Sequence, residues 1–237
     1  LVAWNQTEYE TTRYFQDDVI LGLDPSQASG GDDMGMVFMH IKTGKVLGCV
    51  KINEDNVIMF CQWLVELFET FANLRMIPEN RSTGSSIIDY LLMVLPTKGI
   101  DPFKVIYNRI MSDPEEFPDK YKEASRSLKY RDEEIYVKCK KYFGFVTSSS
   151  GIFSRSELYG TVLQSAAKNV GSFVHSTELI DQINGLTSKN GRVDHGNGKH
   201  DDLCFVGSTL VRTITGNRPL SELELGDLVL TRKGYKP

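Results

Sequence analysis

The stretch VILGLDPSQASGGDDMGMVFMHIKTGKVLGCVKI, from Val19 to Ile52, decides the fold of this chain. The run DVILGLD (Asp18–Asp24) predicts a short apolar strand that ends on a carboxylate, and the turn-forming residues PSQASGGDD follow it. The runs MGMVFMHI (Met34–Ile41) and KVLGCVKI (Lys45–Ile52) flank a Thr-Gly pair and predict a hairpin. Three consecutive strands therefore open the domain.

Helices and strands alternate after this opening. Asn56–Phe71 carries apolar residues at helical spacing and begins with an Asn suited to an N-cap. Leu74–Asn80 is a brief apolar stretch that reads as a fourth strand, Ser82–Leu95 predicts a second helix, and Lys104–Ile110 predicts another strand. The order predicts an α/β fold, in which a mixed sheet carries helices on its faces.

The second half of the chain is more polar. Residues 111–141 are rich in charge and predict a solvated insertion with a hairpin. Residues 154–169 predict a helix, because Ser154 suits the cap and Glu157 is its capping-box partner. Residues 175–186 predict a short element, and a Gly-rich segment then leads to Asp201 and Asp202.

The chain has 237 residues, 41% hydrophobic and 24% charged, which suits one large domain or a domain with a small appendage. Its formal net charge of -4 provides no overall attraction to nucleic acid, so contact with DNA requires a locally basic face. The candidates for that face are Arg155, Lys168, Lys189, Arg192 and Lys199.

Four widely spaced cysteines form no C-x-x-C pair: Cys49, Cys61, Cys139 and Cys204. This spacing argues against a structural zinc site and a disulfide framework, and favours a reducing compartment. No apolar run reaches 18 residues, and the first residues lack the pattern of a signal peptide. We therefore expect a protein that is not secreted and has no membrane contact. Both ends read as cut from a longer protein.

Carboxylates at predicted strand ends are the main candidates for chemistry. They are Asp24 and Glu79, and the pair Asp201 and Asp202 in the Gly-rich segment joins them as a further candidate. Converging carboxylates bind Mg²⁺ or Mn²⁺, and two such ions can activate a water and stabilise the leaving oxygen in phosphodiester cleavage. Spacing alone leaves a second interpretation open, in which each residue is a turn former or a helix cap.

Other polar residues near these carboxylates have two interpretations as well. His195 and His200 can orient water or bind a metal, or they are exposed loop residues. Asp32 and Asp33 can approach a metal, or they are solvated turn residues.

The local sequences around the carboxylates resemble a known family. VILGLDPSQASGGDDMGMVFMHIKTGKVLG, PENRSTGSSIIDYLL and RVDHGNGKHDDL are similar to three motifs in the nuclease domain of viral terminase large subunits, the DNA-packaging motors of tailed phages and herpesviruses. The resemblance covers about Val19 to Leu203 and implies an RNase H-like fold. It also implies two Mg²⁺ or Mn²⁺ ions, with Asp24 bridging them, Glu79 completing one shell, and one or both of Asp201 and Asp202, a pair at a helix start, as further ligands. Pro78 departs from the pattern, because it removes a backbone donor next to Glu79.

From Cys204 onward the pattern changes to short strands and turns. CFVGSTLVRTITGNRPLSELELGDLVLTRKGYKP resembles the opening block of an intein, the Hint fold that hedgehog-type domains share. The resemblance implies that the Cys204 thiol attacks the Leu203 carbonyl, and that the junction interrupts the third nuclease motif. The expected domains are therefore a linker tail at 1–17, an RNase H-like nuclease at 18–203 and a short all-β intein fragment at 204–237.

The resemblance also implies partners and a compartment. The partners are double-stranded DNA, the terminase ATPase domain, the portal, the small terminase subunit and a C-terminal intein fragment, in the host cytoplasm. The chain itself contains no G-x-x-x-x-G-K-[ST] phosphate loop. Two alternatives remain, namely a RuvC-like resolvase or transposase nuclease, and a non-catalytic packaging or assembly module.

Overall fold

A mixed five-stranded sheet lies at the centre of the part of the chain that the structure describes, with strand order β1-β4-β3-β2-β5. The structure is a computed structural model, and it describes residues 2–4, 18–25, 33–42, 46–52, 56–148, 154–168, 177–189, 192–195, 210–213, 216–219, 229–231 and 234–236. The sheet strands are β1 (Val2–Trp4), β2 (Val19–Asp24), β3 (Met34–His40), β4 (Val46–Ile52) and β5 (Leu74–Pro78).

The sheet confirms the predicted opening of the domain. β2 pairs antiparallel with β3, and β3 pairs antiparallel with β4, as the Val19–Ile52 stretch predicts. β1 pairs antiparallel with the other side of β4, whereas β5 lies parallel to β2. The α/β class and the mixed sheet flanked by helices are thus both present.

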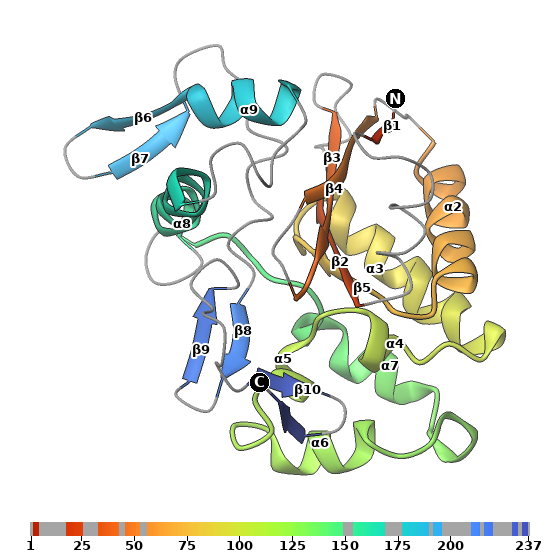
Figure 1. Cartoon of the computed structure of the whole chain (residues 1–237). Coiled ribbons are helices and arrows are strands. Elements are labelled where there is room, and N and C mark those ends of the chain that lie inside the picture. The colour runs from red at the N-terminus through yellow and green to blue at the C-terminus, as the bar shows by residue number, and fades with distance from the viewer. Residues whose placement is uncertain are drawn as a thin grey trace.

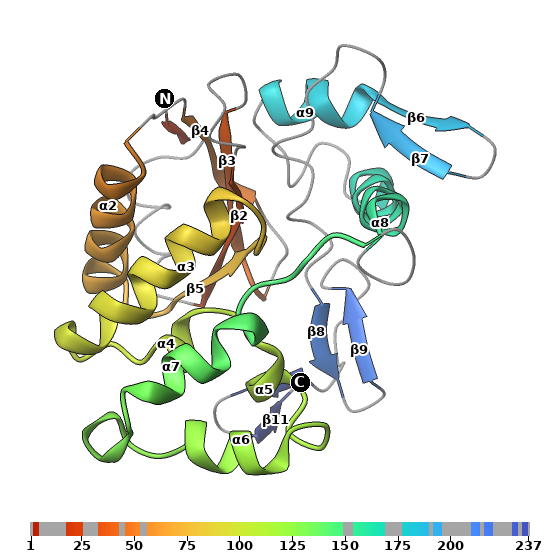
Figure 2. The ribbon, with the colours of Figure 1, turned by 180° about the vertical axis from the view of Figure 1, so that it is seen from behind.

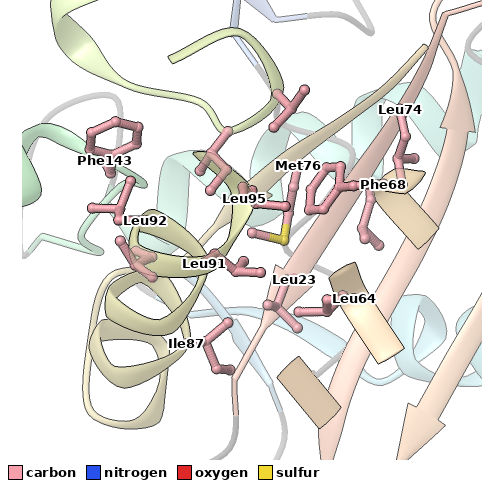
Figure 3. Packing of buried hydrophobic residues seen from close by; sticks show 14 of the residues in the cluster. Leu23, Leu64, Phe68, Leu74, Met76, Ile87, Leu91, Leu92, Leu95 and Phe143 are labelled. Carbon is pink, nitrogen blue, oxygen red and sulfur yellow. The ribbon is translucent and has the colours of Figure 1, made fainter. Parts of the chain in front are cut away.

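Two amphipathic helices, α2 (Val57–Thr70) and α3 (Thr83–Val94), cover one face of the sheet (Figure 1). Asn56 caps α2 as predicted, since its side chain accepts hydrogen bonds from the backbone N–H groups of Ile58 and Met59 at 3.1 and 3.2 Å. Between these helices and the sheet lies one large apolar cluster, in which Leu64 of α2, Leu91 of α3 and Met76 of β5 lie close together (Figure 3). We call this side of the sheet the core face.

Short helices occupy the segment after α3, where the sequence predicted a strand and a solvated hairpin. They are η1 (Leu95–Lys98), α4 (Pro102–Val105), α5 (Arg109–Ser112), α6 (Pro118–Ala124), η2 (Leu128–Tyr130), α7 (Glu134–Cys139) and η3 (Lys140–Tyr142).

The predicted strand Lys104–Ile110 is wrong, because one capping residue before it and one within it start helical turns. Asp101 accepts a hydrogen bond from the N–H of Phe103 and starts α4, and Asn108 accepts one from the N–H of Met111 and starts α5. Two isolated bridges remain of the strand, a parallel one between Met76 and Ile106 and an antiparallel one between Asn108 and Phe143.

The predicted solvated hairpin at 111–141 is also wrong, because this segment contributes to the core. Ala124, Ile135 and Cys139 belong to the large cluster. Arg131, whose side chain is 1% exposed, forms a bidentate ion pair with Asp101 at 2.5 and 3.0 Å. This buried pair ties the short helices to the start of α4.

The opposite face of the sheet, which we call the open face, carries α8 (Arg155–Lys168), α9 (Thr177–Asn184) and the hairpin of β6 (Leu186–Lys189) and β7 (Arg192–His195) (Figures 1 and 2). The N–H of Glu157 donates to the Ser154 hydroxyl at 3.3 Å, which confirms the predicted cap. α9 is the short element predicted at 175–186, and its Leu179 packs on Val37 and Cys49 of the sheet.

A second, antiparallel sheet lies in the C-terminal part, with strand order β11-β10-β8-β9. Its strands are β8 (Leu210–Thr213), β9 (Gly216–Pro219), β10 (Val229–Thr231) and β11 (Gly234–Lys236). The described part of 204–237 is therefore all strand, in agreement with the alternation in the sequence.

Candidate functional site

The carboxylates predicted from the first two motifs lie side by side. Asp24 is the last residue of β2, and Glu79 directly follows β5. The parallel register aligns Leu23 with Pro78, and the N–H of Glu79 donates to the Leu23 carbonyl at 3.0 Å. The next residues along both strands, Asp24 and Glu79, therefore lie opposite each other on neighbouring strands, which are about 4.8 Å apart.

Both carboxylates belong to the open face. Side chains alternate between the two faces of a sheet, and Leu23 points into the large cluster of the core face. Asp24, the next residue, therefore lies on the opposite, open face. Glu79 is two residues after Ile77 and so shares its face, and Ile77 packs with Ile20 of the open face. The carboxylates thus face the layer that contains α8 and α9.

A polar row extends from these carboxylates across the sheet. Gly35 of β3 is the register partner of Asp24, and Lys51 of β4 is the register partner of Gly35. Because Gly35 has no side chain, the position beside Asp24 contributes no bulk to this face. The Lys51 ammonium lies 2.9 Å from Asp33 Oδ2 and 3.6 Å from Glu178 Oε1 of α9. Asp33, one of the two predicted turn or metal residues, is therefore engaged in an ion pair.

Glu79 is held by two residues that the sequence did not indicate. The Thr147 hydroxyl donates a hydrogen bond to Glu79 Oε1, and the Thr147 N–H makes a longer contact of 3.4 Å to the same oxygen. The Nε atom of Arg81 lies 4.0 Å from this oxygen, and the Glu79 side chain is only 13% exposed. Arg81 lies within the second motif, whereas Thr147 is 68 residues away from Glu79 and has no local signal.

The segment that carries Thr147 is fixed beside β5 by backbone hydrogen bonds. The N–H of Phe145 donates to the Pro78 carbonyl at 3.0 Å, and the N–H of Asn80 donates to the Phe145 carbonyl at 2.6 Å. Gly144 has φ +71°, and a Cβ there would lie 2.6 Å from the Pro78 carbonyl oxygen. Only glycine combines this conformation with so close an approach.

Pro78 fits this edge of the sheet. Its carbonyl accepts from Phe145, on the side of β5 away from β2. The N and O atoms of one strand residue point to the same side, so the donor that Pro78 lacks would face this edge and not β2. Pro78 therefore leaves the pairing of Glu79 with Leu23 intact.

The start of α3 closes the site from the other direction. A Cβ on Gly84 would lie 2.0 Å from the Glu79 carbonyl oxygen and 2.7 Å from Pro25 Cγ, so this helix begins in direct contact with the two strand ends. Ser82 immediately before it has φ 45°, a conformation that costs a non-glycine residue of order 1–3 kcal/mol. The small residues of the second motif thus allow the close approach of α3.

Four of the basic residues predicted for DNA contact belong to α8 and the β6–β7 hairpin. Arg155 begins α8 and is exposed, and Lys168 ends that helix. Lys189 and Arg192 are register partners in the β6–β7 hairpin, which joins α8 through a 3.0 Å hydrogen bond from the Val193 N–H to the Ser156 hydroxyl. His195 ends β7, and its side chain lies outside the description, as do those of Lys168 and Lys189.

Several predicted residues lie outside the described residues. They are Asp32, Lys199, His200, Asp201, Asp202 and Cys204. Within the described part of the chain, no group of three or more His, Cys, Asp or Glu side chains is arranged to hold a metal ion. Asp24 and Glu79 supply two of the predicted carboxylates, and oxygen donors of this kind fit Mg²⁺ or Mn²⁺.

Buried thiols do not add to this donor set. Cys49, Cys61 and Cys139, the cysteines that the structure describes, are all buried and form no disulfide. Burial raises the pKa of the Cys61 thiol to about 11, and burial also raises the pKa of Cys139. Both thiols therefore stay protonated near neutral pH. A cysteine acts as a nucleophile or a metal ligand in its thiolate form.

Comparison with known proteins gives no family assignment, since no family model matches the chain and no curated protein matches it. Among the described residues, no helix combines the length and the apolar character needed to cross a membrane.

Proposed function

We propose that residues 18–203 form the metal-dependent endonuclease domain of a viral DNA-packaging terminase, with an RNase H-like fold, which cuts double-stranded DNA concatemers. The observation that carries this proposal is the pairing of Asp24 with Glu79 at the carboxyl ends of neighbouring parallel strands. These residues are distant in sequence and come from two separate motifs that resemble the family.

The carboxylates have distinct roles in this proposal. Asp24 would be a ligand to both of two Mg²⁺ or Mn²⁺ ions, Glu79 would be a ligand to one of them, and one or both of Asp201 and Asp202 would provide the remaining carboxylates. When bound, the ions supply water activation and stabilisation of the leaving oxygen. The contacts of Glu79 support this role, because among the described residues its neighbours reach Oε1 and leave Oε2 without a hydrogen bond or ion pair.

The basic residues predicted from the sequence supply the contact with DNA phosphates that an acidic chain requires. They are Arg155, Lys168, Lys189, Arg192 and Lys199. The partners in packaging are the terminase ATPase domain, the portal and the small terminase subunit, and the compartment is the host cytoplasm.

Residues 204–237 are, in this proposal, the N-terminal fragment of an intein. The Cys204 thiol attacks the Leu203 carbonyl carbon, the peptide C–N bond breaks, and the released amine of Cys204 takes up the thiol proton. Leu203 is left in a thioester, and a C-terminal intein fragment would complete splicing. Before splicing, Asp201 and Asp202 cannot continue into a helix, so we expect the unspliced chain to have weak or no nuclease activity.

Mn²⁺ binding and plasmid cleavage test the proposal. We expect D24N and E79Q each to weaken both by at least about 100-fold, because loss of a mere supporting group already costs about 10- to 100-fold. E66Q is the matched control, since Glu66 is exposed on α2, which covers the other face of the sheet. A chain in which a helix replaces residues from Cys204 onward should cleave faster than the present chain.

Each outcome has a defined meaning. Unchanged Mn²⁺ binding in both D24N and E79Q would refute the metal site and favour a non-catalytic packaging or assembly module. Normal binding with a preference for branched DNA would favour a RuvC-like nuclease. Equal cleavage by the present chain and the helix-restored chain would refute the effect of the junction.

A further inference from the structure

Glu79 is anchored through one of its two carboxylate oxygens. Oε1 accepts the hydrogen bond of the Thr147 hydroxyl and lies near both the Thr147 N–H and Arg81 Nε, at 3.4 and 4.0 Å. Among the described residues, Oε2 has no such contact. The Glu79 side chain is 13% exposed, and within this described part of the chain only one of its two carboxylate oxygens has a hydrogen-bond partner. The other oxygen is therefore able to bind a ligand.

Arg81 closes this arrangement into a ring of contacts. Its Nη2 atom donates a hydrogen bond to the Thr147 carbonyl, while its Nε atom lies near Glu79 Oε1. Thr147 is 7% exposed, so its hydroxyl has little access to water as an alternative partner. The backbone and the side chain of Thr147 are therefore both restrained, and the direction of its hydroxyl is set toward Glu79.

We propose that Thr147 is a positioning residue that orients Glu79, so that Oε2 is directed to a divalent cation shared with Asp24. This inference rests on the proposed function. A hydroxyl suits the task because it donates one hydrogen bond without adding a charge that would compete with the cation. Without this partner the Glu79 carboxylate has more orientations available. Restricting it to one orientation then costs part of the free energy of cation binding.

Mn²⁺ titration of the 237-residue chain, followed by electron paramagnetic resonance of the unbound ion, tests the inference independently of cleavage. T147V keeps the shape of the side chain and removes the hydroxyl, and we expect Mn²⁺ affinity to fall about 10- to 100-fold. T147S restores the hydroxyl and should bind within about threefold of the original chain. T70V is the matched control, because among the described residues the Thr70 hydroxyl bonds within α2, to the Glu66 carbonyl at 2.7 Å.

The results separate this inference from the proposed function. Normal affinity in T147V together with weak binding in E79Q overturns the role of Thr147 and leaves the metal site standing. Normal affinity in T147V, D24N and E79Q overturns both. Equal losses in T147V and T147S assign the effect to packing and overturn the role of the hydroxyl. If T147V does not melt cooperatively, T147A compared with T147S tests the same hydroxyl, and equal affinities overturn the inference.

Discussion

The two faces of the central sheet are built from the same strands but differ in kind. The core face meets α2 and α3 in one large apolar cluster. On the open face, the apolar contacts divide into three small clusters, and the row Glu79, Asp24, Gly35 and Lys51 crosses the sheet. Alternation along a strand thus allows one side to stabilise the fold while the other side carries charge.

The energetic cost of the open face explains its additional contacts. Burial of a Leu or Met side chain on the core face contributes about 1.5–3 kcal/mol, whereas a buried polar group without a partner is destabilising. Thr147 provides a partner for Glu79, and Asp33 and Glu178 provide partners for Lys51. The polar row is therefore supported by segments from outside the sheet.

The largest stability effect should come from the core face. Leu64 is completely buried between α2 and the sheet, so L64A should lower the free energy of unfolding by about 2–5 kcal/mol, measured by urea denaturation. M59A on the same helix should change it by less than about 0.5 kcal/mol, because Met59 is 57% exposed. Below the unfolding transition, L64A should keep its Mn²⁺ affinity. A loss of that affinity in the folded protein would show that the two faces are coupled.

An intermediate effect should come from Gly144, at the edge between the two faces. G144A should cost about 1–3 kcal/mol of unfolding free energy, because a Cβ would approach the Pro78 carbonyl and φ is +71°. G99A is the matched control, since Gly99 has φ +74° and no atom within 4 Å of an added Cβ.

The same pair of variants also reports on the site. G144A should be more destabilising than G99A. Of the two variants, G144A should also be the one that weakens Mn²⁺ binding, because the backbone bonds of Gly144 and Phe145 keep the following Thr147 beside Glu79. Equal unfolding free energies and equal Mn²⁺ affinities in the two variants would contradict a tight fit of this segment to β5.

Local signals in the sequence were sufficient for the core face. The hairpin of β3 and β4, the Asn56 cap and the apolar periodicity of α2 act within a few residues, and all three were predicted. The same reading placed Asp24 and Glu79 at strand ends, and the parallel pairing of β2 with β5 brings them together.

Long-range contacts account for what the sequence did not indicate. Arg131 appeared as one charge among many in a polar segment, but it is buried against Asp101, 30 residues away. Thr147 has its role only because residues 143–147 run beside β5. The strand predicted at Lys104–Ile110 failed for a local reason, since Asp101 and Asn108 offer helix caps that compete with an extended backbone.

The smallest effect should come from the open face itself, where Leu179 joins α9 to Val37 and Cys49. L179A should lower the global free energy of unfolding by less than about 2 kcal/mol, below the L64A value, because an eight-residue helix on a small cluster can detach locally before the sheet unfolds. Hydrogen exchange should instead accelerate in the amides of α9 and leave those of α2 unchanged. I180A is the matched control, since Ile180 on the same helix is 37% exposed. If L179A lowered the free energy of unfolding as much as L64A, the open face would contribute to the core as strongly as the core face does. The division of the sheet into a stabilising face and a chemical face would then be wrong.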